Sequence, residues 1–433
     1  MHGGGNFTAQ NKILPGAYIN FISAERSGSV FGERGRVAIG LSHNWGGNEV
    51  IELDRETFGK NAKKILGYSA TDEKVRAFRE LFQGAKTVIF QRLNKNGAKA
   101  TKTEGTLTVT ATKEGSRGND LAVTISAGLE NTFTITTKLG TDKVDEQVAK
   151  KPADVKNNDF VAFHWTGTSI AAAALIKLSG GSDGTVNGEA HTEFLSKLES
   201  RDFNILAYDG TDNSIKELYI AYTKRLRDEL GIKFQTVLFK KAANYEGVIN
   251  VTTEAAEMAS GLIYFTAGKL AGAEIQRSLT NETYTGEYTV KSEYTMNALK
   301  EAIKRGEFVF HKVGEEYRAL SDVNSLTEEV PEKSKDFKNN QVIRVLDQIG
   351  KDIAAIFNSK YLGKVQNNKD GQISLWSEIV KHANTLQNMG AIRSFQSEDV
   401  EVLEGEDKDS VIVNYAILPA VTMNKLYMTV MVN

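Results

Sequence analysis

The chain has 433 residues, 40% of them hydrophobic and 25% charged, which is typical of a globular protein with a sizeable core. Its 53 Lys and Arg residues balance 55 Asp and Glu residues, so no basic surplus favours nucleic acid as the main partner. The lack of cysteine excludes disulfides, thiolate metal sites and a cysteine nucleophile.

The length favours about three domains. The first six residues lack the basic and apolar segments of a signal peptide. The longest near-apolar stretch, residues 259–273, is shorter than a membrane span and contains Lys269. We therefore expect synthesis in the cytoplasm.

Residues 1–20 form a predicted N-terminal arm. Gly3–Gly5 are costly to order, so this segment is not a core element. Its apolar end, Ile13 to Ile19, needs a surface on which to dock, either in the C-terminal domain or on a neighbouring chain.

The next segments alternate between strand and helix patterns. Residues 35–41 and 86–93 read as strands, and between them Thr71-Asp72 precedes a helix that ends at Gly84. After residue 189 the alternation returns with a helix at 191–198, a strand at 204–208, a helical face over 215–230, a strand at 234–239 and an Ala-rich helix at 254–271. This order predicts an α/β middle domain of residues 21–94 plus 186–320.

A separate all-β module of residues 95–185 interrupts that domain. It consists of short alternating runs, many of them rich in Thr, with glycine turns between several of them: residues 106–112, 121–126, 132–138, 159–165 and 170–178. The pattern predicts a sandwich-like insertion.

A polar stretch over residues 320–340 marks the start of a C-terminal α+β domain, residues 321–433. Its first helix has an apolar face from Val342 to Ile356, and its second spans residues 373–389. Two alternating runs, 411–417 and 426–432, predict two terminal strands separated by Pro419.

The second terminal run is apolar on both faces and has only Lys425 near its start as a charge. It therefore completes a sheet, either in another subunit or as an inner strand of its own last domain. The pattern alone leaves both alternatives open.

Sites for chemistry are few in this sequence. The six histidines are scattered, with no metal-ligand spacing, and the turn at Asn368–Gly371 lacks the acids of a calcium loop. No phosphate-binding glycine loop is present. We expect no metal and no cofactor.

Gly180-Gly181-Ser182-Asp183-Gly184 satisfies the Gly-x-Ser-x-Gly pattern of a nucleophile elbow. No helix follows Ser182 directly, because residues 183–188 intervene, and no histidine stands in a recognisable partner motif. We expect a glycine turn and no enzyme, with a serine hydrolase that uses Ser182 as the alternative.

Several segments, taken in order, resemble the contractile phage tail sheath family, which includes the sheaths of phage-tail-like bacteriocins. The segments that carry the resemblance are 82–88, 115–120, 178–184, 267–272, 277–280, 322–327, 344–347, 361–365 and 419–432. The sequence departs from the family pattern at Ser325, where a threonine is usual, and its β module is small.

The resemblance implies a structural protein that polymerises as a helical sleeve of stacked rings around a tail tube and contracts to drive the tube through a target cell envelope. Subunits of this family are woven together by their termini through strand addition. The residues implied in contacts between subunits are Ile13, Leu14, Tyr18, Ile19, Leu426, Tyr427, Met428, Val430 and Val432.

The resemblance also implies a place and partners for the particle. The C-terminal domain would line the sleeve, so Glu378, Lys381 and Asn388 on the second helix are the candidates for contact with the tube. Expected partners are further copies of the chain, the tube protein, and baseplate and terminator proteins, with no nucleic acid and no membrane insertion. The particle would be a virion or a phage-tail-like particle assembled in the bacterial host cytoplasm.

Overall fold

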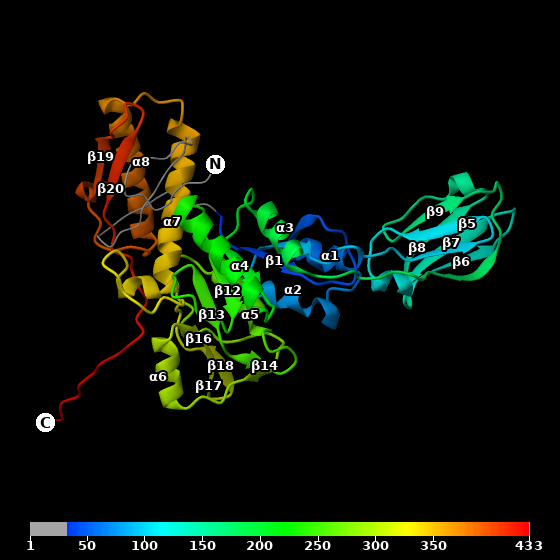
Figure 1. Ribbon diagram of the computed structural model, residues 1–433, viewed down its shortest axis with the longest axis horizontal. Helices are drawn as coiled ribbons and strands as arrows, with labels where there is room; N and C mark the ends of the chain where they lie inside the picture. Colours follow the sequence, from blue (N-terminus) through cyan, green and yellow to red (C-terminus); the bar gives the residue numbers. More distant parts are fainter. Residues whose placement is uncertain (1–32, 433) are drawn as a thin grey trace. The chain divides into compact units, whose positions relative to one another are not determined.

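The computed structural model describes residues 33–432 (Figure 1). They divide into two compact units: the first holds residues 33–38, 80–86 and 202–432, and the second holds residues 39–79 and 87–201. The prediction of a mixed α/β and α+β chain with a β-sandwich is confirmed, and the four-part division of the sequence stays a prediction. Among the helices of the described residues, none combines the length and apolar composition that crossing a membrane requires.

The second unit begins within β1 (Arg36–Leu41) and contains an antiparallel pair, β2 (Val50–Asp54) with β3 (Thr87–Arg92). Between β2 and β3 lie α1 (Arg55–Leu66), a short 3-10 turn and α2 (Arg76–Leu81), and α3 (Gly188–Leu198) ends the unit. The strands at 35–41 and 86–93 and the helix that ends before Gly84 are confirmed. Both β2 and α1 went unpredicted.

The β-sandwich of the second unit has two antiparallel sheets, ordered β10-β6-β7-β8 and β4-β5-β9. The five predicted alternating runs are strands β5, β6, β7, β9 and β10, whereas β4 and β8 were not predicted. Buried side chains from both sheets form one core, which also takes in Trp45. The strands span Thr101–Glu104, Leu107–Ala111, Leu121–Ala127, Phe133–Leu139, Asp142–Ala149, Val161–Trp165 and Ala173–Lys177, from β4 to β10.

The first unit contains a run of parallel sheet strands in the order β16-β13-β12-β11. Small antiparallel pairs, β14 with β15 and β17 with β18, accompany it. The strands from β11 to β18 span Ile205–Tyr208, Gln235–Phe239, Val248–Val251, Glu254–Ala255, Val290–Lys291, Glu307–Phe308, Phe310–Val313 and Glu316–Ala319. The helices are α4 (Asn213–Lys224, continued by a π turn to Glu229), α5 (Leu262–Gly272) and α6 (Met296–Lys304).

The prediction of an Ala-rich helix from residue 254 is wrong at its start. Glu254 and Ala255 pair with β15 instead, and α5 begins only after Gly261. Backbone pairing in this stretch outweighs the helix propensity of its alanines.

Close backbone packing explains two glycine motifs that lie far apart in the sequence. A Cβ atom on Gly268 would lie 2.1 Å from the carbonyl oxygen of Leu81, and one on Gly272 would lie 1.9 Å from that of Gly84. The turn at Gly84 and helix α5 therefore approach so closely that only glycine fits at these positions.

The C-terminal part of the first unit packs α7 (Asn340–Ile356) and α8 (Lys369–Asn388) against the hairpin of β19 (Val400–Glu404) and β20 (Val411–Tyr415). Both predicted helices and the first terminal strand are confirmed, although α8 begins four residues before the predicted start. Asn368 caps α8 by accepting a hydrogen bond from the Gly371 amide at 2.9 Å, so the calcium-like turn is a helix entry.

Candidate polymerisation interface

The hairpin β19–β20 is a two-stranded sheet with its inner face on the C-terminal core. Val402 pairs with Val413 in an antiparallel register, and the Trp376 indole donates to the carbonyl of Val400 at 3.0 Å. Within the described chain, no further strand lies against either outer edge of this hairpin. Open edges of this kind can accept strands from another chain.

Among the described residues, 418–422 are the last that form hydrogen bonds to the body of the unit. The Arg393 amide donates to the carbonyl of Leu418 at 3.1 Å, and the Ala420 amide donates to that of Ala391 at 2.9 Å. The side chain of Gln341 then bonds to the backbone of both Ala420 and Thr422.

Beyond Thr422 the chain leaves the unit as an exposed tail, red in Figure 1. The predicted strand at 426–432 is not formed in the single chain, and the alternative that it is an inner strand of its own domain is wrong. An extended segment with no strand beside it makes no ladder of hydrogen bonds. The exposed fractions of the predicted contact residues are 85% for Leu426, 88% for Tyr427, 74% for Met428, 70% for Val430 and 92% for Val432.

The predicted contact residues of the N-terminal arm, Ile13, Leu14, Tyr18 and Ile19, lie outside the described residues.

On α8, two of the three residues predicted to face the tube, Lys381 and Asn388, are exposed. The third, Glu378, is half-buried and forms an ion pair with Lys360 at 2.8 Å. The spacing of charges on the helix could not reveal this partner, which comes from the π turn that follows α7.

The loop that contains Ser182 is a structural turn in the β module. The Ser182 hydroxyl accepts a hydrogen bond from the Ala98 amide at 3.1 Å, and the Asn119 side chain bonds to both backbone groups of Gly181. Asp183 accepts from the Ser116 amide at 2.6 Å. Two segments that carried the family resemblance, 115–120 and 178–184, are thus partners, and nothing supports the hydrolase alternative.

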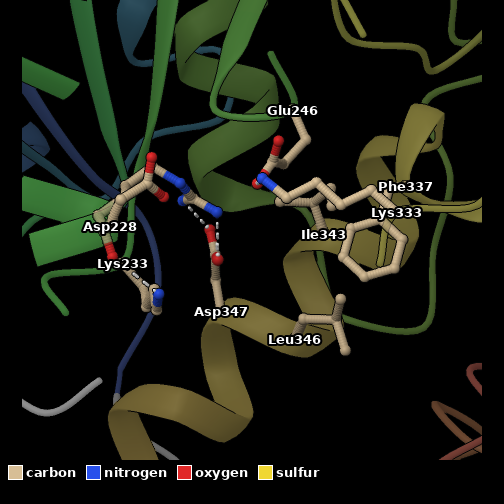
Figure 2. Close-up of a pocket in the computed structure, with 9 residues that line it drawn as sticks. Asp228, Lys233, Glu246, Lys333, Phe337, Ile343, Leu346 and Asp347 are labelled. Atoms are coloured by element: carbon tan, nitrogen blue, oxygen red, sulfur yellow. Dashed lines mark hydrogen bonds and ion pairs between the residues drawn. The ribbon is translucent and has the colours of Figure 1, made fainter. Parts of the chain in front are cut away.

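A small pocket in the first unit is lined by charged side chains from the region of the parallel strands and from α7 (Figure 2). The guanidinium of Arg227 pairs with both carboxylate oxygens of Asp347, at 2.7 and 2.8 Å, and Lys333 pairs with Glu246 at 2.7 Å. The pocket holds about 20 Å³, which suits one water molecule and excludes a larger ligand.

The charges of this pocket shift one another's proton affinity. Burial, followed by the charge of Arg227, lowers the pKa of Lys233 to about 8. Asp347 in turn raises the pKa of Arg227, although burial opposes this, so the guanidinium stays charged. Buried and half-buried charges that pair with one another therefore line the pocket. Sequence reasoning missed it, except that Asp347 lies in a motif of the family resemblance.

Three family models match the chain: the phage tail sheath β-sandwich domain over residues 95–183, the central domain over 184–325 and the C-terminal domain over 332–433. The protein XkdK of the phage-like element PBSX of Bacillus subtilis (strain 168) is 31% identical, with 100% of both chains covered. The chain belongs to the phage tail sheath family.

Solved structures agree with this assignment. The sheath tail protein from Desulfitobacterium hafniense matches with a TM-score of 0.83 and 36% identity, over 95% of this chain and 99% of that one. The sheath of an extracellular contractile injection system, PVC, in its contracted state shares the fold alone, with a TM-score of 0.54 and 11% identity over 98% and 99% of the chains. The chain is thus a structural subunit of a contractile tail sheath.

Proposed function

We propose that this subunit polymerises through strand exchange at its termini. The observation that carries the proposal is an apolar tail, residues 423–432, that is exposed in the single chain. The same unit presents a hairpin, β19–β20, and no further strand of the described residues lies against its edges. A donor strand and an acceptor sheet in one chain are the two parts that addition of strands between copies requires.

The energy of one such link is moderate. A nine-residue strand spans about 30 Å, and each of its backbone hydrogen bonds contributes about 1 kcal/mol net. Burial of Leu426, Met428 and Val430 adds up to about 2 kcal/mol for each side chain, from which the cost of ordering the tail is subtracted. Repetition around a ring makes the lattice cooperative.

The N-terminal arm supplies the second link in this proposal. Ile13, Leu14, Tyr18 and Ile19 would dock on the C-terminal domain or on a neighbouring copy. Residues 95–185 would form an outer module, residues 21–94 with 186–320 the middle domain, and residues 321–433 the polymerisation domain.

The sleeve would surround a tail tube, with α8 as the inner face, and would end at a baseplate and a terminator. It would assemble in the cytoplasm of the host bacterium. Energy stored at assembly would drive contraction by re-packing of rigid domains, with no enzymatic step.

Negative-stain microscopy of the purified chain mixed with its tube protein tests this function. Long sleeves around tubes are the expected result. Compact particles that never polymerise, or esterase activity that depends on Ser182, would overturn it.

A further inference from the structure

The side chain of Gln341 stands at the point where the C-terminal tail changes from bound to free. Gln341 is the second residue of α7, and its side chain is 1% exposed. The tail beyond Thr422 has no hydrogen bond to the body of the unit among the described residues. A buried amide at this boundary needs partners, because an unpaired buried polar group is costly.

The carboxamide of Gln341 supplies the donor and the acceptor that the backbone of a neighbouring strand would otherwise provide. Its Nε2 atom donates to the carbonyl oxygens of Gln276, at 2.8 Å, and Ala420, at 3.0 Å. Its Oε1 atom accepts from the Thr422 amide at 3.2 Å and from the Thr422 hydroxyl at 3.4 Å. One side chain thus satisfies a C=O and an N–H of residues 420–422, immediately before the tail, as a neighbouring strand would.

The helical turn that carries Gln341 is itself held on several sides. The Asn340 side chain accepts from Gln235 at 2.9 Å and donates to Asp322 at 3.0 Å. Arg344 donates to Asp322 at 3.3 Å and to the carbonyl of Arg277 at 2.8 Å. Asn340, Asp322 and Arg344 are at most 2% exposed. A load on residues 420–422 would therefore reach the rigid interior of the unit.

We propose that Gln341 is the residue that positions the C-terminal arm: it fixes residues 420–422 to α7, so that the arm swings from residue 423 onward. This inference rests on the proposed function. If Gln341 fixes residues 420–422, the hinge of the arm lies after Thr422, and only the residues from 423 onward are free to enter a neighbouring subunit.

Hydrogen exchange with single-residue resolution tests the clamp on the full-length single chain, before any assembly. Gln341→Met keeps the length of the side chain but removes its hydrogen bonds. The Thr422 amide is expected to exchange about fivefold faster or more, while the Arg393 amide keeps its rate. An unchanged Thr422 amide overturns the clamp.

A second variant breaks the same contact from the exposed side, at Thr422, so that no buried side chain is changed. Thr422→Pro removes the N–H that Gln341 binds at an exposed position, and Thr422→Ser keeps it as the matched control. Sleeves mixed from tube and subunit are expected to form with Thr422→Ser. Thr422→Pro is expected to give at least about fivefold fewer extended sleeves.

Ile349→Val separates this effect from a general loss of stability. It shortens a fully buried side chain on the same helix, leaves the tail contacts intact and should keep the yield of sleeves. Wild-type yields from Thr422→Pro and Gln341→Met would overturn the inference. Failure of the wild-type chain itself to form sleeves would overturn the proposed function, whereas the exchange result would still decide on the clamp.

Discussion

Neutralising Asp347 is predicted to destabilise the first unit strongly. The Arg227–Asp347 pair is bidentate, and the two side chains are 5% and 9% exposed. Asp347→Asn leaves a buried guanidinium without its countercharge, a change that costs about 3–5 kcal/mol in comparable buried pairs. Because Arg227 keeps its bond to the carbonyl of Phe234, we expect the lower end, about 3 kcal/mol.

The double variant Arg227→Met, Asp347→Leu supplies the contrast. It removes both charges and, among the contacts of the described residues, leaves the carbonyl of Phe234 without its side-chain donor, so it should cost about 1–2 kcal/mol, less than Asp347→Asn alone. Urea unfolding that is monitored by hydrogen exchange in peptides from α7 measures the free energy of unfolding of this unit.

An exposed pair is the matched control. Glu301 and Lys304 on α6 lie 2.7 Å apart, with side chains 51% and 71% exposed, and Glu301→Gln should leave the urea midpoint unchanged. The reasoning is refuted if Asp347→Asn shifts stability no more than this control does. It is equally refuted if the costs of Arg227→Met and Asp347→Leu, each made alone, simply add in the double variant.

Three further predictions follow from individual residues. The pKa of Lys233 is about 8 in the folded chain and 10.5 as its ordinary value, so between these pH values the unfolded chain binds one proton more than the folded chain. The free energy of unfolding should therefore rise with pH across that window, by on the order of 3 kcal/mol. Urea titrations should show this rise in the wild-type chain and not in Lys233→Met. Ser182→Ala should leave sleeve formation intact, whereas Gly181→Val should unfold the β module as seen by circular dichroism. The reason is that a Cβ atom at position 181 would lie 2.6 Å from the carbonyl oxygen of Gly115. A more severe effect of Ser182→Ala than of Gly181→Val would contradict the assignment of this loop as a structural turn. Lys381→Glu, with Glu378 left in its ion pair, should reduce the yield of tube-templated sleeves while the melting temperature stays that of the wild-type chain, and an unchanged yield would remove α8 from the tube contact.

Patterns with a short period predicted most of the fold. The alternating run at 411–417 gave β20, and the apolar face from Val342 to Ile356 gave α7, because in both segments one side of the element is buried. Helix α1 was missed, although its buried residues Phe58, Ala62 and Leu66 recur every four positions between an Asp cap and a Gly. That signal was available in the sequence.

The side-chain contacts near the candidate interface could not be predicted from patterns with a short period. Gln341 meets Ala420 across 79 positions and Arg227 meets Asp347 across 120, so neither pair leaves a local trace. The tail shows the opposite limit: its alternation predicts a strand, but the single chain forms none there, because a strand needs a neighbour. In the proposed function, residues 426–432 enter a sheet only when a second chain supplies it, and the pattern of one chain does not show that neighbour.

Sleeve assembly by residues 1–422, compared with the full chain under identical conditions, tests the central claim most directly. Because residues 423–432 are exposed, their removal should leave a folded subunit with the same melting temperature. A full-length control with Leu426, Met428 and Val430 changed to Ser separates loss of burial from loss of length. The account predicts extended sleeves from the full chain and none from residues 1–422; extended sleeves from the truncated chain would contradict it.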